Sequence, residues 1–239
     1  MRVNYEKWSL RKKYFWRRMW EDYEIGYLDR DLVPLIALLN RDRDIYTTSS
    51  CSGRIVVVDG AVPWVREEAD VIFKSHTPVA WSDIEFIYKT PPHRGYWLVV
   101  TGPILHFSTT SIKKAVSLLK KARIAGFKHS GIMHISTTRG VFVELVTGVY
   151  MTQLIKTRNL DVVSQHDIVE VLALFNRALI EGKQRLQRLY EVFENSLPEN
   201  PDLEVERELS SRRVEIALRK PIEVFYEICG DLCREFLRT

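Results

Sequence analysis

The stretch 47–54 reads Thr-Thr-Ser-Ser-Cys-Ser-Gly-Arg and gathers hydroxyl groups, a thiol and a guanidinium in one short segment. It leads directly into an apolar, β-branched run at 55–58. Small polar residues before such a run predict a loop that presents side chains and backbone N–H groups at one place. Such a loop can bind an anion or polar ligand, with Arg54 as a forked donor. An ordinary Ser-rich turn explains the pattern equally well. The candidate ligand-binding residues are Ser49, Ser50, Cys51, Ser52, Gly53 and Arg54.

Further polar residues lie at the ends of other predicted strands, and strand ends of a small sheet can converge on one pocket. Each residue also has an ordinary explanation. His106 lies between two apolar neighbours and fits a hydrogen-bonded core histidine, whereas Glu144 fits the solvent side of an alternating strand. Cys51 fits a small residue that fills the core. The additional candidates are Lys74, His76, His106, Lys128, Ser130, Gly131 and Glu144.

Several common catalytic motifs are absent from the sequence. No Gly-x-Gly-x-x-Gly follows the first predicted strand, which argues against a Rossmann cofactor site. The chain also has no phosphate-binding Gly-x-x-x-x-Gly-Lys-Ser/Thr, no His-Glu-x-x-His and no Gly-x-Ser-x-Gly. The predicted chemistry therefore depends on none of these sites.

The cysteines and histidines do not predict a metal centre. Three cysteines do not make a disulfide framework. Cys229 and Cys233 lie four apart on a predicted helix, and without a second pair nearby we interpret them as core residues rather than zinc ligands. The histidines show no ligand spacing. His129 and His134 flank a turn and could meet in space, but we expect no metal there.

The composition describes a globular chain. It has 239 residues, of which 46% are hydrophobic and 28% charged, which is enough for a substantial core. No apolar segment approaches the roughly 20 residues that cross a bilayer. The N-terminus lacks an apolar signal core, so we expect a cytoplasmic protein without membrane contact.

Charge is unevenly distributed along the chain, whose net charge is +4. Basic residues alternate with aromatic ones over 7–18, a second basic group occupies 113–129, and acidic residues concentrate in the C-terminal third. This distribution favours a phosphate-rich partner.

The order of predicted elements indicates an α+β fold with a compact mixed or antiparallel sheet, flanking helices and no Rossmann domain. We expect one core domain over 1–197, with a basic N-terminal helix and a long amphipathic helix at 165–195. A helical C-terminal extension over 198–239 could support a homodimer. The expected helices span 4–24, 30–40, 83–88, 111–125, 165–195, 203–219 and 221–236. The expected strands span 54–59, 70–75, 96–100, 104–107, 132–136, 141–146 and 161–163.

The segment 45–55, Ile-Tyr-Thr-Thr-Ser-Ser-Cys-Ser-Gly-Arg-Ile, resembles the signature of the tRNA wybutosine-synthesising protein 3 family. Further motifs follow in the family's order, so the resemblance covers about residues 28–195. They are Phe-Lys-Ser-His-Thr-Pro-Val at 73–79, Pro-Ile-Leu-His-Phe at 103–107 and Ala-Gly-Phe-Lys-His-Ser-Gly-Ile at 125–132. The long helix carries the matching residues Phe175, Asn176, Arg185, Leu186, Arg188, Leu189 and Tyr190.

The resemblance implies a methyltransferase that uses S-adenosylmethionine to methylate N4 of a demethylated tricyclic wyosine base, 3′ of the anticodon in phenylalanine tRNA. The anticodon arm would then be the partner. Ser49, Ser50, Ser52 and Arg54 would bind the cofactor carboxylate or an RNA phosphate. His76 or His106 would accept the leaving proton or orient the base. Lys128 and Ser130 would contact ligand, and Glu144 would bind a ribose hydroxyl or the methionine ammonium.

The chain departs from the family pattern at three places. Gly102 precedes Pro103 where the family usually has Glu, and Val146-Thr147-Gly148 replaces an Arg-Ser-Thr segment. The following Val-Pro-Leu is replaced by Met151-Thr152-Gln153-Leu154. Three hypotheses are therefore open. The protein is an active methyltransferase of this pathway, an RNA-binding paralogue without the reaction, or a structural protein whose basic helix is a solvated face.

Overall fold

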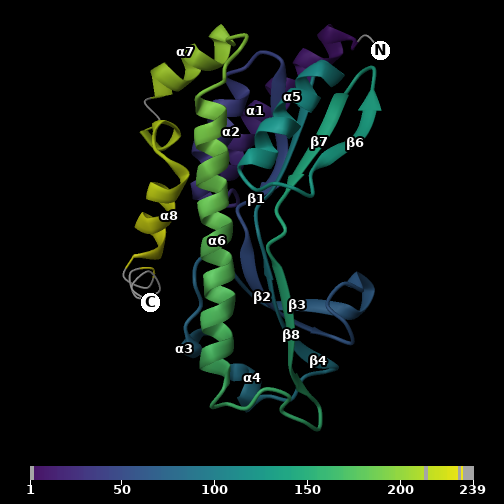
Figure 1. Ribbon diagram of the computed structural model, residues 1–239, viewed down its shortest axis with the longest axis vertical. Coiled ribbons are helices and arrows are strands. Elements are labelled where there is room, and N and C mark those ends of the chain that lie inside the picture. The colour runs from purple at the N-terminus through teal and green to yellow at the C-terminus, as the bar shows by residue number, and fades with distance from the viewer. Residues whose placement is uncertain (1–2, 213–214, 231–232, 234–239) are drawn as a thin grey trace. The chain divides into compact units, whose positions relative to one another are not determined.

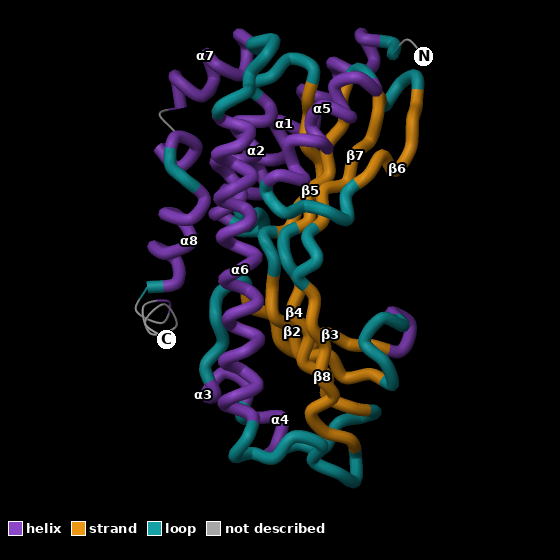
Figure 2. The backbone as a smooth tube through the Cα atoms, in the orientation of Figure 1, coloured by secondary structure: helices purple, strands orange, loops and turns teal. Residues whose placement is uncertain are grey.

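The computed structural model describes residues 3–212, 215–230 and 233, and it contains two four-stranded sheets. All strand pairs are antiparallel. The chain divides into two compact units, each built on one sheet. The first unit comprises Met1–Ser52, Pro103–Gly148 and Lys183–Phe225, and the second comprises Gly53–Gly102, Val149–Gly182 and Tyr226–Thr239. Figures 1 and 2 show the elements of each.

The sheet of the first unit has the order β1-β5-β7-β6. Its inner face is apolar and packs against helices, because alternate residues of β5 and β7 such as Leu105, Phe107 and Val143 are fully buried. The strands are β1 (Ile45–Cys51), β5 (Ile104–Thr109), β6 (Gly131–Ser136) and β7 (Gly140–Val146). The helices are α1 (Tyr5–Glu24), η1 (Arg30–Leu32), α2 (Val33–Asn40), α5 (Ile112–Ile124), α7 (Leu203–Arg212), η3 (Glu215–Leu218) and most of α8 (Pro221–Cys229).

The sheet of the second unit has the order β3-β2-β4-β8. Its buried residues Ile55, Val57 and Leu98 form a core with the apolar stripe of α6, including Leu172 and Phe175. The strands are β2 (Arg54–Gly60), β3 (Ala69–Ser75), β4 (Gly95–Thr101) and β8 (Tyr150–Thr157). The short helices are η2 (Arg66–Glu68), α3 (Trp81–Ile84) and α4 (Phe86–Lys89).

The long helix α6 (Ile168–Glu194) contributes to both units. Apolar residues at alternating three- and four-residue spacing give it a continuous buried stripe, as the sequence predicts. Its N-terminal part, up to Gly182, belongs to the second unit, and its C-terminal part, from Lys183, belongs to the first. None of the described helices is long and apolar enough to span a membrane.

The α+β class with antiparallel strands is confirmed, but several predicted elements differ. The strands form two sheets rather than one. Most of the segment 47–54, expected as a loop, lies in β1, because Ile45, Tyr46 and Thr47 favour a strand and pair with β5, with an irregularity before Ser50. β8 was not expected. Residues 161–163 form no strand, since Asp161 makes only an isolated bridge.

The C-terminal region differs from its prediction in two ways. The helix expected over 203–219 is broken into α7 and η3, and part of the helix expected over 221–236 lies outside the described residues. Cys229 and Cys233 are buried as predicted, yet they form a disulfide rather than two free thiols, since their Cα atoms lie 5.6 Å apart. The boundary at residue 198 and a homodimer through these helices stay predictions.

A buried cation fixes α1 in the first unit. The ammonium of Lys12 is nearly inaccessible and donates to the Asn40 and Asp42 carbonyls at 2.8 and 2.6 Å. It also forms an ion pair of 2.9 Å with Asp202. Burial acts to raise the pKa of Asp202, but the hydrogen bond and charge of Lys12 outweigh it and hold this pKa below its usual value. Burial lowers the pKa of Lys12 despite this pairing, so the folded state favours the Asp202 carboxylate while it carries the cost of a buried ammonium.

We expect Asp202→Asn to lower the free energy of unfolding at pH 7 by about 2 kcal/mol, because it leaves Lys12 buried without its carboxylate. The lowered pKa of Asp202 means that this contribution is present above the unfolded pKa of about 3.9 and is lost as pH falls through the folded value. Urea unfolding at several pH values measures it. Glu204→Gln breaks the exposed pair with Lys13 and should cost less than about 0.5 kcal/mol. Equal losses of unfolding free energy in the two variants would contradict the stabilising role of Asp202 beside the buried Lys12.

Candidate functional site

A row of polar residues crosses the sheet of the first unit. His106 on β5 pairs in register with Glu144 on β7, and Glu144 pairs with Gly131 on β6. The Nε2 atom of His106 lies 2.7 Å from Oε2 of Glu144, and its Nδ1 lies 3.2 Å from the hydroxyl of Ser49 on β1. The structure thus brings together predicted residues from all four strands.

Both ring nitrogens of His106 have partners. Nδ1 also lies 3.0 Å from the carbonyl oxygen of Ser49, which can only accept a hydrogen bond. In both protonation states of the ring, Nε2–H donates to the carboxylate of Glu144. In the neutral ring, Nδ1 accepts a hydrogen bond from the Ser49 hydroxyl, and in the protonated ring Nδ1–H donates to the Ser49 carbonyl. This geometry fixes the orientation of the ring, so His106 links Ser49 to Glu144.

Helix α1 covers part of the same outer face of the sheet. Trp8 donates from its indole N–H to the Ser108 hydroxyl at 3.2 Å, and Phe15 stacks on Tyr46 with ring centroids 5.5 Å apart. Farther along this face, the side chains of His106 and Glu144 keep 23% and 34% of their exposure. The polar row is therefore accessible beside an aromatic helix.

Ser49 and Ser50 also line a pocket of about 310 Å³ between α1 and β1. The hydroxyl of Ser50 is buried and has no hydrogen-bond partner, which is unusual for a buried polar atom. The aromatic wall consists of Tyr14 and Phe15 from α1 and Tyr27. A pocket with aromatic rings on one side and hydroxyls on the other is suited to a flat heterocycle. The sequence did not single out Tyr14 or Tyr27 as binding residues.

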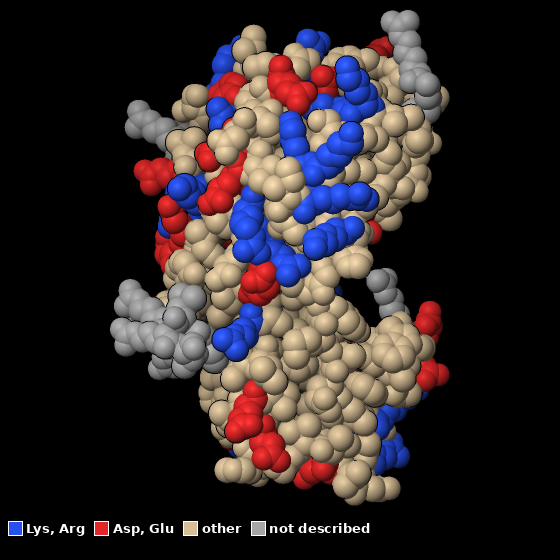
Figure 3. Space-filling view, viewed as in Figure 1, with Lys and Arg blue, Asp and Glu red and all other residues tan. Residues whose placement is uncertain are grey.

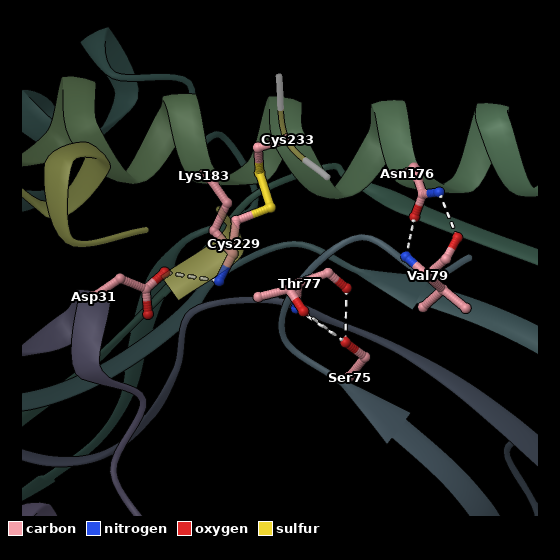
Figure 4. Close-up of a disulfide and its surroundings, with 8 residues drawn as sticks. All are labelled: Asp31, Ser75, Thr77, Val79, Asn176, Lys183, Cys229 and Cys233. Atoms are coloured by element: carbon pink, nitrogen blue, oxygen red, sulfur yellow. Dashed lines mark hydrogen bonds and ion pairs between the residues drawn. A yellow bond between two sulfur atoms is a disulfide. The ribbon is translucent and has the colours of Figure 1, made fainter. Parts of the chain in front are cut away.

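Ser52 has a different environment from Ser49. It is fully buried, and its backbone N–H donates to Asp29 at 2.8 Å. Its hydroxyl accepts a hydrogen bond from the ammonium of Lys183, which also forms an ion pair of 2.7 Å with Asp31 (Figure 4). Ser52 is thus held inside the protein by two charged side chains, Asp29 and Lys183, and Asp31 holds Lys183 in turn.

Sequence reasoning missed Asp29, Asp31 and Lys183. A signal for Lys183 exists, because it follows Leu179 by four residues and precedes Leu186 by three, which puts a charge in the apolar stripe of α6. Lys183 and Asp31 retain only 1% and 4% of their side-chain exposure. A charge at such a position needs a buried counter-charge, but the sequence does not say which carboxylate supplies it.

We expect Lys183→Met to lower the free energy of unfolding by about 3 to 5 kcal/mol, because it leaves the Asp31 carboxylate buried without its cation. The double variant Asp31→Asn/Lys183→Met should recover part of this loss. Urea unfolding measures both. Arg177→Met, on the exposed side of the same helix, serves as the control and should cost less than about 0.5 kcal/mol. A Lys183→Met variant as stable as this control would refute the assignment.

The other predicted residues near Ser52 in sequence belong to the second unit. Gly53 has φ +95°, and a Cβ there would lie 2.8 Å from the Thr101 carbonyl oxygen, so only glycine fits. Its own carbonyl accepts a hydrogen bond from Nδ1 of His76 at 3.1 Å. Arg54 and Lys74 are exposed on β2 and β3. The second unit therefore offers a fixed imidazole and two accessible cations.

We expect Gly53→Ala to lower the free energy of unfolding by at least about 1 to 2 kcal/mol, since it adds left-handed backbone strain and a clash with Thr101. Gly131→Ala is the matched control. A Cβ at Gly131 would meet nothing within 4 Å, and this change should cost less than about 0.5 kcal/mol. Thermal or urea unfolding of the two variants measures the difference. A Gly53→Ala variant as stable as the wild type would contradict the requirement for glycine at position 53.

The turn at 127–131 is pinned by Ser130. Its hydroxyl donates to the Phe127 carbonyl and accepts the Val146 N–H, both at 2.9 Å. Phe127 is fully buried, whereas Lys128 is exposed. The Ser130 hydroxyl thus shapes the turn, and Lys128 is the predicted binding residue that this turn presents to solvent. Cys51 is a partly buried cysteine at the end of β1 and forms no disulfide.

The second unit also contains a buried amide that the sequence analysis did not explain. Asn176 on α6 accepts from the Val79 N–H at 2.8 Å and donates to the Val79 carbonyl at 2.9 Å (Figure 4). These two bonds satisfy both polar groups of a backbone residue just after the segment that carries His76. Asn176 therefore fixes the end of that segment.

Fold and site together define a class of protein: a non-Rossmann α+β protein with an accessible row of hydroxyl, imidazole and carboxylate groups. The chain matches the family Methyltransferase TYW3 over residues 10–195 and belongs to it. It is therefore a methyltransferase, and its reaction requires a methyl donor.

Curated relatives and solved structures agree with this membership. A relative from Saccharolobus solfataricus is 39% identical over 75% of this chain and 86% of its own length, and one from Aeropyrum pernix is 34% identical over 68% and 86%. Both are named tRNA(Phe) 7-((3-amino-3-carboxypropyl)-4-demethylwyosine(37)-N(4))-methyltransferase. The PH1069 protein from Pyrococcus horikoshii has a similar structure, with a TM-score of 0.73 and 28% identity over 79% of this chain and 97% of that protein.

Proposed function

We propose that this protein transfers a methyl group from S-adenosylmethionine to N4 of 7-(3-amino-3-carboxypropyl)-4-demethylwyosine at position 37 of tRNA(Phe). The names of the relatives support this substrate, and family membership supports the reaction class. The observation that carries the proposal is the polar row Ser49–His106–Glu144 beside the aromatic pocket with its unpartnered Ser50 hydroxyl.

The residues of the pocket fit a nucleoside. The Ser50 hydroxyl needs a partner, and the rings of Tyr14 and Tyr27 can contact a heterocycle. Both the methyl donor, which contains adenosine, and the tricyclic base have this chemistry. When bound, S-adenosylmethionine supplies an electrophilic methyl group on a sulfonium. Ser49 and Ser50 would hold polar groups of the ligand, and Glu144 would accept from a ribose hydroxyl or an ammonium.

Methyl transfer to a ring nitrogen needs positioning and removal of one proton. A bond forms between N4 and the methyl carbon, the bond from sulfur to that carbon breaks, and the proton on N4 leaves to a base. We assign the base to His76, whose ring is oriented by the hydrogen bond from Nδ1–H to the Gly53 carbonyl at 3.1 Å. His106, with both ring nitrogens engaged, acts as a positioning residue for Ser49 and Glu144.

The remaining predicted residues fall into two sets, exposed side chains that can contact a ligand and residues that shape the backbone of the site. Arg54, Lys74 and Lys128 are exposed cations that would contact the cofactor carboxylate or RNA phosphates. Ser52 and Ser130 already have protein partners for their hydroxyls, so they would shape the site through the backbone. Gly53 would do the same through its lack of a side chain, whereas a Cβ at Gly131 would meet nothing within 4 Å, so Gly131 takes part only as backbone of β6.

We expect His76→Ala to lower kcat at least about 100-fold, because a positioned base contributes on that scale. The assay is methylation of tRNA isolated from cells that lack this step, read by mass spectrometry of position 37. His166→Ala changes an exposed histidine of the same unit and should retain wild-type kcat.

Binding measurements separate the alternatives. Calorimetric titration with S-adenosylmethionine should show a complex for the wild type, whereas an RNA-binding paralogue without the reaction would bind tRNA only. Wild-type rates in His76→Ala, Arg54→Ala and Ser130→Ala together would overturn the site assignment.

A further inference from the structure

A separate basic pocket lies in the first unit, where α5 ends near α6. Its volume is about 290 Å³, and among the described residues that line it none is Asp or Glu. The lining comes from the end of α5, the turn that follows it, Gly148 just after β7, and α6. Its titratable side chains are Lys128, His129, Arg185 and Arg188. The pocket therefore concentrates positive charge in a concave surface.

Two glycines make room for these side chains. Gly126 has φ +92°, and a Cβ there would lie 3.4 Å from Cδ and 3.6 Å from Nε of Arg185. A Cβ at Gly148 would lie 3.2 Å from Nε2 of His129. The side chain of Arg185 and the ring of His129 thus lie against glycine backbone, where a larger residue would crowd them.

The supporting segments are fixed in position. The turn that carries Lys128 and His129 is held by the Ser130 hydroxyl and by a bond from the His129 N–H to the Val146 carbonyl at 3.3 Å. On α6, Leu186 and Leu189 are buried on either side of Arg188, which is exposed. The cations are therefore presented from ordered backbone, which reduces the entropy lost when they bind an anion.

The pocket belongs to a wider basic face. Figure 3 shows Lys and Arg side chains gathered over α5 and the adjoining part of α6, and α5 contributes Lys113, Lys120 and Arg123 from exposed positions. The C-terminus of α5 favours a nearby cation through its dipole. That effect is limited to the last turn, so it does not account for Lys113 at the other end of the helix or for a second arginine on α6.

We infer that this basic pocket binds a phosphate of the tRNA backbone, with Arg185 and Arg188 as forked donors and Lys128 as a point charge. The inference rests on the proposed function, since it assigns a place on the protein to that tRNA. A guanidinium matches two phosphate oxygens, and the surrounding basic face can follow the neighbouring phosphates of a strand. Such contacts position an RNA without reading its sequence.

The test measures binding of an unmodified tRNA(Phe) transcript by filter retention over a series of KCl concentrations. We expect Arg185→Ala/Arg188→Ala to weaken binding about tenfold near 0.1 M KCl and to reduce the slope of log K against log salt by about 1.5. Arg185→Lys/Arg188→Lys should restore most of the slope because it keeps both charges. Arg177→Ala, an exposed arginine elsewhere on α6, is the matched control and should retain wild-type affinity.

Two further readouts separate this inference from the proposed function. Calorimetry should give the double Ala variant wild-type affinity for S-adenosylmethionine, and thermal melting should show that it is folded. If the wild type methylates tRNA but the double Ala variant keeps wild-type affinity and salt slope, the phosphate-binding role of the pocket is overturned and the proposed reaction is not. If the double Ala variant loses salt slope but the wild type does not methylate tRNA, the phosphate-binding role of the pocket is supported and the proposed reaction is refuted. A wild type that binds no tRNA would overturn both.

Discussion

The ion pair between Lys183 and Asp31 is the interaction on which the candidate site depends most. Removing two charges from water lowers the stability of the folded state unless the charges pair with each other. Here the two groups pair at 2.7 Å, and both side chains are almost fully buried. The same ammonium donates to the Ser52 hydroxyl, while Asp29 takes the Ser52 N–H. One buried cation therefore fixes Ser52, which follows the last residue of β1 and precedes Gly53, the first residue of the second unit.

The antiparallel sheet of the first unit makes the second contribution. Because residues paired in register lie side by side, His106 and Glu144 face each other although 38 residues separate them along the chain. Their strands bury Leu105, Phe107 and Val143 on the opposite face, which rules out a shift of register by one residue. The apolar core thus determines the polar row on the outer face.

Polar groups in this protein are of two kinds. Many, such as the hydroxyls of Ser52 and Ser130 and the amide of Asn176, are satisfied by protein partners and serve to hold backbone in place. The Ser50 hydroxyl is buried without a protein partner and borders a pocket, so a ligand in that pocket would satisfy it. Exposed cations are a second set of groups without a structural role in the core. Their gathering on one face (Figure 3) agrees with a polyanionic substrate.

The sequence by itself determined the long amphipathic helix, most strands, the non-Rossmann class and the family motifs, because apolar periodicity and local residue order are properties of neighbouring residues. It did not determine that residues 45–51 pair as a strand, that the strands divide into two sheets, or that Cys229 and Cys233 are bonded. It also missed Asp29, Asp31 and Lys183. Cys229 and Cys233 are only four residues apart, and that spacing alone does not distinguish a disulfide from two buried thiols. The strand pairing and the buried charges depend on partners distant in the chain. Only the tertiary structure brings such partners within hydrogen-bond distance, because burial leaves each charge or backbone group no water to bind instead.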